Sequence, residues 1–256
     1  MSKFITIASG KGGTGKTTTA INLAKALTNF GRDVIVVDGN VTTPNIGLNL
    51  GTPFVKVNLH DVLKGKNKID EAIYKHASGI KVVPAGISLD DLSGIDISRI
   101  SKVFADMENK AEIVIVDSAA GLGKESITMM GAADEIFVVT TPDITSVTDS
   151  LRTIKLAEAN GGNVAGVIVN KVIGDKLEMT IEEIEEMLEQ KVIGIIPYDN
   201  NVRVALKKNH PVLHLYPNSK SSVGFKKIAA LLVGEKYGAM QERLGFFSRI
   251  FGFLRQ

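Results

Sequence analysis

The segment GKGGTGKT, residues 10–17, constrains the fold of this chain more than any other part of the sequence. It fits the pattern G-x-x-x-x-G-K-[ST] and follows the apolar run FITIAS, so it stands between a predicted strand and a predicted helix. In that position backbone N–H groups and the helix dipole bind phosphate oxygens, and glycines let the backbone approach them closely. The segment therefore predicts a phosphate-binding loop in an α/β fold. The predicted nucleotide-binding residues of the loop are Gly10, Lys11, Gly12, Gly13, Thr14, Gly15, Lys16, Thr17 and Thr18.

Side chains in and beyond this loop have predicted roles in catalysis and metal binding. Lys16 would reach the β- and γ-phosphates of ATP, and the hydroxyl of Thr17 would bind Mg²⁺. Asp38 and Asp117 each close an apolar run and are expected to complete the metal site, although an aspartate there can also be only a helix cap. Both begin predicted switch loops, DGNVTTPNIG and DSAAG, and in the second the N–H of Gly121 would sense the γ-phosphate.

Apolar, β-branched runs alternate with amphipathic segments along the chain. This pattern is typical of a buried, mostly parallel sheet with helices on both faces, and 256 residues are enough for one large core. The predicted strands are 4–9, 33–38, 79–85, 112–117, 135–141, 164–171 and 192–197, and the predicted helices lie near 16–30, 97–107, 145–159, 180–190 and 221–233. We predict a doubly wound α/β domain over residues 1–234, followed by a C-terminal linker and amphipathic helix over 235–256.

The absence of cysteine excludes several kinds of site. Without thiolates the chain has no disulfide, no iron–sulfur cluster and no cysteine nucleophile. A formal net charge of +2 is too small to indicate a nucleic-acid partner. The histidines lack a metal-ligand pattern and are interpreted as structural; they are His60, His76, His210 and His214. With no signal peptide and no run of about 20 apolar residues, the sequence predicts a cytoplasmic protein.

Lys11 is a second lysine in a loop that needs only one. With it, KGGTGKT resembles the deviant Walker A motif of the ParA/MinD family of ATPases. The resemblance covers nearly the whole chain, because VVDGN, IVDSAAGLG, ADEIFVVTTPDITSVTDSLRTI and VIGIIPYDNNVRVAL are similar to segments of MinD proteins in order and spacing. It implies the P-loop NTPase fold and a homodimer that forms around two ATP molecules. Lys11 would then act on the partner's nucleotide, like an arginine finger.

Two further parts of the predicted site come from this resemblance. Asn170, Pro197 and Asp199 match positions that contact adenine, while an asparagine after a strand is equally often a turn residue. Asn40 matches the second aspartate of D-x-D, which orients the attacking water in the family. An amide can hold a water but cannot accept its proton, so we expect ATP hydrolysis to be slow.

The end of the chain has an amphipathic pattern. At about 100° per residue, one half of the helical wheel over 244–256 is apolar and the other carries glycine, serine, glutamine and arginine. The apolar residues are Leu244, Phe246, Phe247, Ile250, Phe251, Phe253 and Leu254. A core helix is the alternative, but the terminal position and the resemblance to the MinD membrane-targeting helix favour attachment to an anionic membrane surface. Two such helices on one dimer would bind far more tightly than one.

These features lead to three functional hypotheses. The first is a MinD-like ATPase that uses ATP and Mg²⁺, binds the inner face of the cell membrane as an ATP-bound homodimer, and positions a division site or polar apparatus with an activating or effector protein. The second is a ParA-type DNA-segregation ATPase, for which the basic candidates are Lys207, Lys208, Lys220, Lys226 and Lys227. The third is an ATP-locked dimeric scaffold with little turnover. We expect no nucleic-acid partner.

Overall fold

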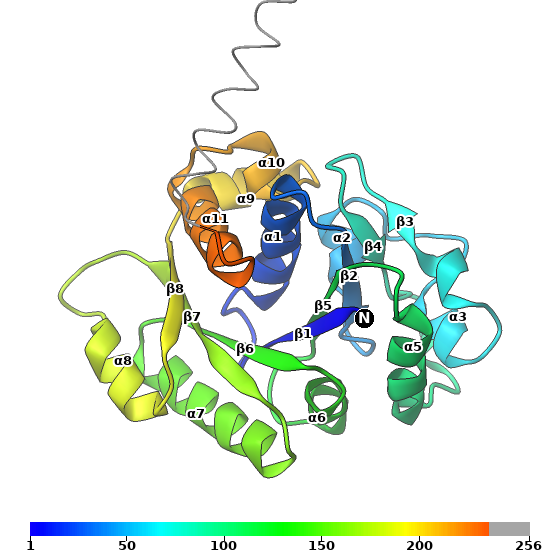
Figure 1. Cartoon of the computed structure of the whole chain (residues 1–256), viewed down its shortest axis with the longest axis horizontal. Helices are drawn as coiled ribbons and strands as arrows, with labels where there is room; N and C mark the ends of the chain where they lie inside the picture. The colour runs from blue at the N-terminus through cyan, green and yellow to red at the C-terminus, as the bar shows by residue number, and fades with distance from the viewer. Residues whose placement is uncertain (236–256) are drawn as a thin grey trace, which may run out of the picture.

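The apolar runs predicted as strands form one sheet in the computed structural model, which describes residues 1–235. The sheet has eight strands in the order β3-β4-β2-β5-β1-β6-β7-β8 (Figure 1). Every neighbouring pair is parallel except β3 and β4. The strands are β1 Lys3–Ala8, β2 Val34–Gly39, β3 Tyr74–Lys75, β4 Lys81–Val83, β5 Ile113–Ser118, β6 Glu135–Thr140, β7 Val164–Val172 and β8 Val192–Pro197. The short antiparallel edge strand β3 is the one that the sequence pattern did not predict.

Helices cover both faces of the sheet. One face packs against α1 and α11, on which α10 packs in turn, and the other packs against α5, α6, α7 and α8 (Figure 1). The helices are α1 Lys16–Asn29, α2 Ile46–Asn49, α3 Leu59–Leu63, η1 Ile69–Ala72, α4 Leu89–Leu92, η2 Ile97–Arg99, α5 Ile100–Met107, α6 Lys124–Gly131, α7 Ile144–Ala159, α8 Ile181–Leu188, α9 Asn200–Lys207, α10 Val212–Leu215 and α11 Lys220–Leu232. Because both faces are covered, every residue of β2 and β5 is buried, which explains the apolar runs VIVV and IVIV that precede Asp38 and Asp117 in these strands.

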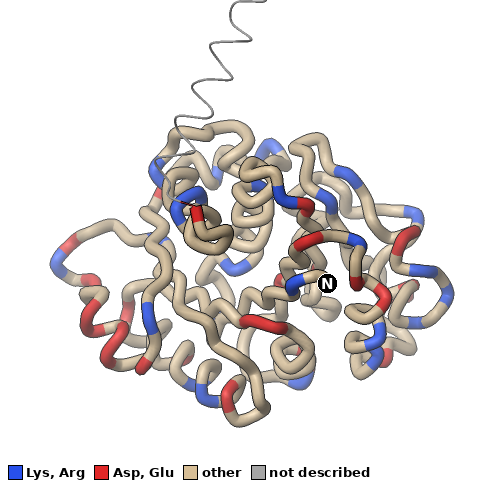
Figure 2. Tube along the Cα trace, viewed as in Figure 1, with Lys and Arg blue, Asp and Glu red and all other residues tan. Residues whose placement is uncertain are grey.

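The acidic segment TIEEIEEMLEQK shows why charge alone does not indicate a site. In α8 the side chains of Ile184 and Leu188 are buried, while Glu182, Glu183 and Glu186 are exposed. Figure 2 shows acidic residues along this helix, at the lower left of the view. The glutamates therefore form a solvated face, as the spacing predicts.

The C-terminal prediction lies beyond the part of the chain that the structure describes. The predicted membrane-binding residues, Leu244, Phe246, Phe247, Ile250, Phe251, Phe253 and Leu254, are all outside residues 1–235. The division into 1–234 and 235–256 therefore stays a prediction. Within residues 1–235, no helix has both the length and the apolar character needed to cross a membrane.

Candidate nucleotide site

The glycine-rich segment forms the turn between β1 and α1. Gly13 and Gly15 have φ values of +85° and +96°, which L side chains rarely adopt. Gly15 precedes the first helical residue, and no side chain caps α1 there. The first N–H groups of α1 are therefore placed at the loop, where a phosphate can accept from them.

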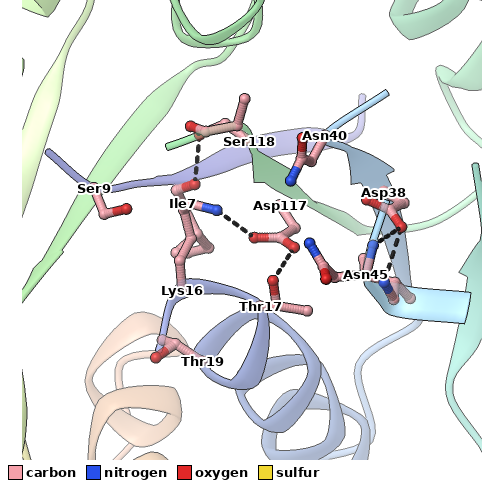
Figure 3. A network of polar contacts seen from close by, with 12 residues as sticks. Ile7, Ser9, Lys16, Thr17, Thr19, Asp38, Asn40, Asn45, Asp117 and Ser118 are labelled. Carbon is pink, nitrogen blue, oxygen red and sulfur yellow. Dashed lines mark hydrogen bonds and ion pairs between the residues drawn. The ribbon is translucent and has the colours of Figure 1, made fainter. Parts of the chain in front are cut away.

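Two aspartates lie side by side at the carboxyl end of the sheet. Asp38 on β2 and Asp117 on β5 are direct neighbours in the strand register, and both are fully buried. Lys16 Nζ lies 3.3 Å from Asp117 Oδ1, and the Thr17 hydroxyl donates to Asp117 Oδ2 at 2.5 Å (Figure 3). Burial raises the pKa of the Asp117 carboxyl, and the neighbouring Lys16 and Thr17 oppose that rise. The structure thus brings Lys16, Thr17 and both aspartates together, as the sequence predicts.

Asp38 is the carboxylate with unused capacity to bind a cation. Its Oδ2 accepts from the backbone N–H groups of Asn45 and Ile46, at 2.9 and 2.8 Å, while its buried Oδ1 has no hydrogen-bond partner (Figure 3). Burial and the charge of Asp117 raise its pKa well above the ordinary value. Two buried carboxylates beside a hydroxyl are the oxygen ligands that Mg²⁺ prefers, so these residues fit the predicted metal. Metal binding would relieve the charge repulsion between them.

The loop after β2 is folded around Asn40. The side-chain oxygen of Asn40 accepts from the N–H of Thr43 at 3.2 Å and from its hydroxyl at 3.0 Å. Glu125 of α6 accepts from the N–H and the hydroxyl of Thr42, at 3.2 and 2.7 Å. The loop after β2, which is the first predicted switch loop, is therefore hydrogen-bonded to α6. This helix follows the second predicted switch loop, DSAAG.

Lys11 lies at the rim of the site, away from the aspartate pair. Its Nζ is 3.4 Å from Oδ1 of Asp143, the residue that caps the first turn of α7. Thr141 and Ser146 also donate to Asp143 and hold its pKa well below the ordinary value. Lys11 is thus paired at the surface of its own chain, while Lys16 occupies the buried position.

Residues from distant segments support the loop. Asn170 at the end of β7 donates to the carbonyl of Thr14 at 2.7 Å, and Lys171 donates to that of Gly13 at 2.6 Å. A Cβ at Gly15 would lie 2.1 Å from the Asn170 amide, and a Cβ at Gly10 would lie 2.3 Å from the backbone of Asp149 on α7. These close approaches give the glycines a packing role besides phosphate access.

A cavity of about 770 Å³ lies over the loop. Of the predicted residues it is lined by Lys11, Gly12, Gly13, Thr14, Gly15, Lys16, Thr17, Thr18 and Asn40. The side chains of Asp38 and Asp117 are fully buried and do not line the cavity. The N–H of Gly121 donates to the carbonyl oxygen of Ser9 at 2.9 Å. Lining residues outside the predicted site and switch segments are Ser9, Asn49, Gly123, Lys124, Glu125, Lys171, Val202, Arg203 and Leu206. Three of these belong to α9, whose start after β8 was signalled by the capping residue Asp199.

The predicted adenine-binding residues have structural partners of their own. Asn170 supports the phosphate-binding loop, as described above. Asp199 accepts from Asn201 at the start of α9 and from the hydroxyl of Ser221 at 2.7 Å, and Pro197 ends β8. The cavity reaches this region through Val202 and Leu206 of α9. Contact of Asn170, Pro197 and Asp199 with the base stays a prediction.

The histidines lie apart from this cavity. The rings of His76 and His210 are 5.2 Å apart between centroids, and those of His210 and His214 are 5.0 Å apart. Pro211 separates the last two, and α10 begins only after it. Across residues 1–235, no group of three or more histidine, aspartate and glutamate side chains is arranged as a metal-ligand set.

A glycine-rich loop between the first strand and helix of a parallel sheet, with carboxylates at the neighbouring strand ends, defines a P-loop nucleotide-binding protein. A family model described as the CobQ/CobB/MinD/ParA nucleotide-binding domain matches residues 5–212, and the chain belongs to that family.

Individual relatives agree with this assignment. An ATP-binding protein of Methanocaldococcus jannaschii is 40% identical over 243 residues, which is 95% of this chain and 92% of that protein. The antiactivator FleN of Pseudomonas aeruginosa is 31% identical, over 89% of this chain and 85% of FleN. The septum site-determining protein MinD of Pyrococcus horikoshii, solved with Mg-ADP, superposes with a TM-score of 0.86 at 30% identity, covering 91% of this chain and 96% of that one.

These comparisons confirm three predictions. The resemblance to the ParA/MinD family is confirmed, and so is the fold class, a mostly parallel P-loop sheet flanked by helices. The cofactors predicted for a domain of this kind, ATP and Mg²⁺, are confirmed at the level of the family. The roles of individual side chains, the dimer and the membrane contact belong to the proposal that follows.

Proposed function

We propose that this protein is a MinD-like ATPase that binds Mg-ATP, dimerises around it and attaches to an anionic membrane surface in that state. The observation that carries the proposal is the different placement of the two lysines of the loop, Lys11 and Lys16. Lys16 is buried beside the metal-binding carboxylates, whereas Lys11 is over one-third exposed at the rim, held by a single exposed ion pair. Such a pair contributes little free energy, so Lys11 is available to reach a second nucleotide across a dimer. The protein would act as a spatial regulator at the inner face of the membrane, with an activating or effector protein.

In this mechanism the loop N–H groups and Lys16 bind the phosphates. Thr17, Asp38 and Asp117 would hold Mg²⁺, which neutralises phosphate charge when bound. Asn40 would orient the attacking water by a hydrogen bond, without accepting its proton. Phosphoryl transfer depends mainly on positioning and charge, and therefore an amide at this position would slow hydrolysis without abolishing it. Gly121, which follows Asp117 and donates to Ser9 beside the loop, would respond to loss of the γ-phosphate.

Sedimentation with anionic liposomes tests this function. Purified protein is mixed with vesicles of phosphatidylglycerol and phosphatidylcholine in ATP or in ADP, and the pelleted fraction is measured. We expect several-fold more pelleting in ATP, because a dimer presents two C-terminal segments where a monomer presents one. Equal pelleting in both nucleotides would show that the nucleotide is not the switch. No pelleting in either would remove the membrane from the proposal.

Replacement of Asn40 by aspartate is expected to raise the rate of ATP turnover by about 10-fold. This is less than the roughly 100- to 10,000-fold typical of general acid–base catalysis, because phosphoryl transfer depends mainly on positioning and charge. The carboxylate can orient the water and also accept its proton, and position 40 already lines the cavity. Phosphate release under saturating Mg-ATP measures the rate, and Asn49→Asp, which adds the same charge elsewhere on the cavity wall, is the matched control. Equal rates for the wild type and Asn40→Asp would mean that position 40 does not orient the water.

One of the five lysines proposed for DNA binding in the DNA-segregation hypothesis is not at the surface. Lys226 is buried, and its ammonium donates to the carbonyl of Pro217 at 2.6 Å. Lys207 and Lys208 end α9, while Lys220 and Lys227 belong to α11. A DNA-binding face needs several cations directed at one phosphate track, and the burial of Lys226 leaves four exposed candidates at two helices.

A further inference from the structure

A buried histidine outside the nucleotide cavity contacts the loop that carries Asn40. His60 is the second residue of α3 and has no exposed surface. Its Nε2 lies 3.0 Å from the carbonyl oxygen of Val41, and its Nδ1 lies 2.9 Å from the backbone nitrogen of Gly86. The ring therefore joins two loops that are far apart in the sequence, the one after β2 and the one after β4.

These partners determine the protonation state of the ring. The N–H of Gly86 can only donate, so Nδ1 must accept with its lone pair. Nε2 then carries the single ring proton and donates it to the carbonyl of Val41, which can only accept. His60 is thus neutral, in agreement with the lowered pKa that burial produces.

The contact with Val41 acts on one particular peptide group. The carbonyl of Val41 and the N–H of Thr42 belong to the same planar peptide unit. His60 binds the carbonyl from one side, and Glu125 accepts from the N–H at 3.2 Å from the other. This peptide lies between Asn40 and Thr43, and Thr43 donates both of the hydrogen bonds that orient the Asn40 side-chain oxygen. A rotation of the peptide would therefore change the direction of the Asn40 amide.

The position of His60 is itself well determined. Asn58 and Asp61 form a capping box at the start of α3, and the N–H of Leu59 donates to the carbonyl of Pro84 at 2.9 Å. A Cβ at Gly86 would lie 2.3 Å from the Asp91 carboxyl and 2.5 Å from the Asn58 amide, so a larger residue there would have to displace these side chains. The imidazole is therefore held on both sides by residues of the chain itself.

We propose that His60 is a positioning residue for the reaction: by donating to the Val41 carbonyl it fixes the Val41–Thr42 peptide and hence the direction in which Asn40 presents its amide to the nucleotide cavity. This inference rests on the proposed function, since it takes Asn40 as the group that orients the water. The hydrogen bond from Gly86 has a different role: it orients the ring and attaches the loop after β4 to α3.

Two substitutions separate the two bonds of the ring. His60→Gln can place an amide N–H near the position of Nε2, and so keeps a donor for Val41 but loses the acceptor for Gly86. His60→Asn places its polar group near Nδ1, and so keeps an acceptor for Gly86 but loses the donor for Val41. Both variants remove the imidazole from the core, so a general loss of packing affects them alike.

The test combines turnover with amide hydrogen exchange. At saturating Mg-ATP we expect kcat of His60→Asn to fall about 10-fold, as for a misplaced catalytic group, with KM for ATP unchanged within about twofold. His60→Gln should keep kcat within about threefold of the wild type. In exchange measurements on the nucleotide-free protein, residues 39–46 should exchange faster in His60→Asn, and residues 84–92 faster in His60→Gln.

Each outcome decides between positioning and packing. Equal losses of kcat in the two variants, or faster exchange of both loops in both variants, would overturn the proposal and leave His60 as a packing residue. If the wild type itself releases no phosphate, the proposed ATPase fails, and the exchange pattern alone still decides whether His60 holds the Val41–Thr42 peptide. Exchange at wild-type rates in residues 39–46 of His60→Asn would overturn it as well.

Discussion

Replacement of Lys16 by alanine is expected to weaken Mg-ATP binding by about 100-fold or more. A hydrogen bond to a charged group contributes about 1.5–3 kcal/mol, and a loss of about 1.4 kcal/mol lowers affinity tenfold. An ammonium that binds two phosphates makes two such bonds, so its removal is expected to lower affinity by about 100-fold or more. The structure adds a second cause. Lys16 is the cation beside Asp117, and without it the buried carboxylates repel the incoming phosphates. Titration with a fluorescent ATP analogue in the presence of Mg²⁺ measures the affinity.

Lys171→Ala is the matched control for this experiment. Lys171 lines the same cavity and is also a lysine, but it is exposed and donates to the loop carbonyl of Gly13. We expect its replacement to weaken binding by less than about fivefold, in line with the small contribution of exposed charges. Thermal unfolding without nucleotide shows whether either variant is destabilised. Binding by Lys16→Ala within about threefold of the wild type would contradict the assignment of the phosphate-binding lysine.

Removal of residues 244–256 is expected to abolish ATP-dependent pelleting with anionic liposomes and to leave ATP binding unchanged. The predicted helix there carries its apolar residues on one half and arginines on the other, which suits insertion at a lipid interface. A single short helix binds a membrane weakly, and two on one dimer gain about 100-fold in avidity. The cavity found in the described part of the chain is lined by residues 9–206, and we therefore expect truncation to leave ATP binding unchanged.

A pair of substitutions tests the apolar face without shortening the chain. Phe247→Asp places a charge on the apolar half of the predicted helix, and Ser248→Asp places the same charge on the polar half. We expect the first to remove at least about 90% of the pelleted protein and the second to reduce it by less than half, since only the first buries a carboxylate in lipid. Pelleting by the truncated protein at the wild-type level would contradict the membrane assignment of this segment.

The sequence was most informative where function depends on residues close together in the chain. The loop from Gly10 to Thr18 combines its glycines, Lys16 and Thr17 within one strand–turn–helix unit, so their geometry follows from local structure. The strands were predicted equally well, because a sheet covered on both faces leaves residues 34–37 of β2 and 113–116 of β5 wholly apolar. Short elements such as β3, α3 and α4 were not predicted, since they have too few residues to show a period.

Contacts between segments remote in sequence required the strand order. Asp38 and Asp117 become neighbours only because β2 pairs with β5, and Asn170 reaches Thr14 because β7 ends beside the loop. The sequence named these residues but could not say which pairs they form.

By itself, the sequence determined the class of this protein. A strand, a glycine-rich turn and a helix identify a P-loop nucleotide site, because phosphate binding there uses adjacent backbone N–H groups and adjacent side chains. The second lysine, Lys11, gives the loop its resemblance to the ParA/MinD family. Only the tertiary structure decided that Lys11 is paired with Asp143, that Asp38 keeps an unused carboxylate oxygen, and that the His60 ring holds Val41. Hydrogen bonds act over about 3 Å, and which distant residues come that close is decided by the packing of the sheet and its helices.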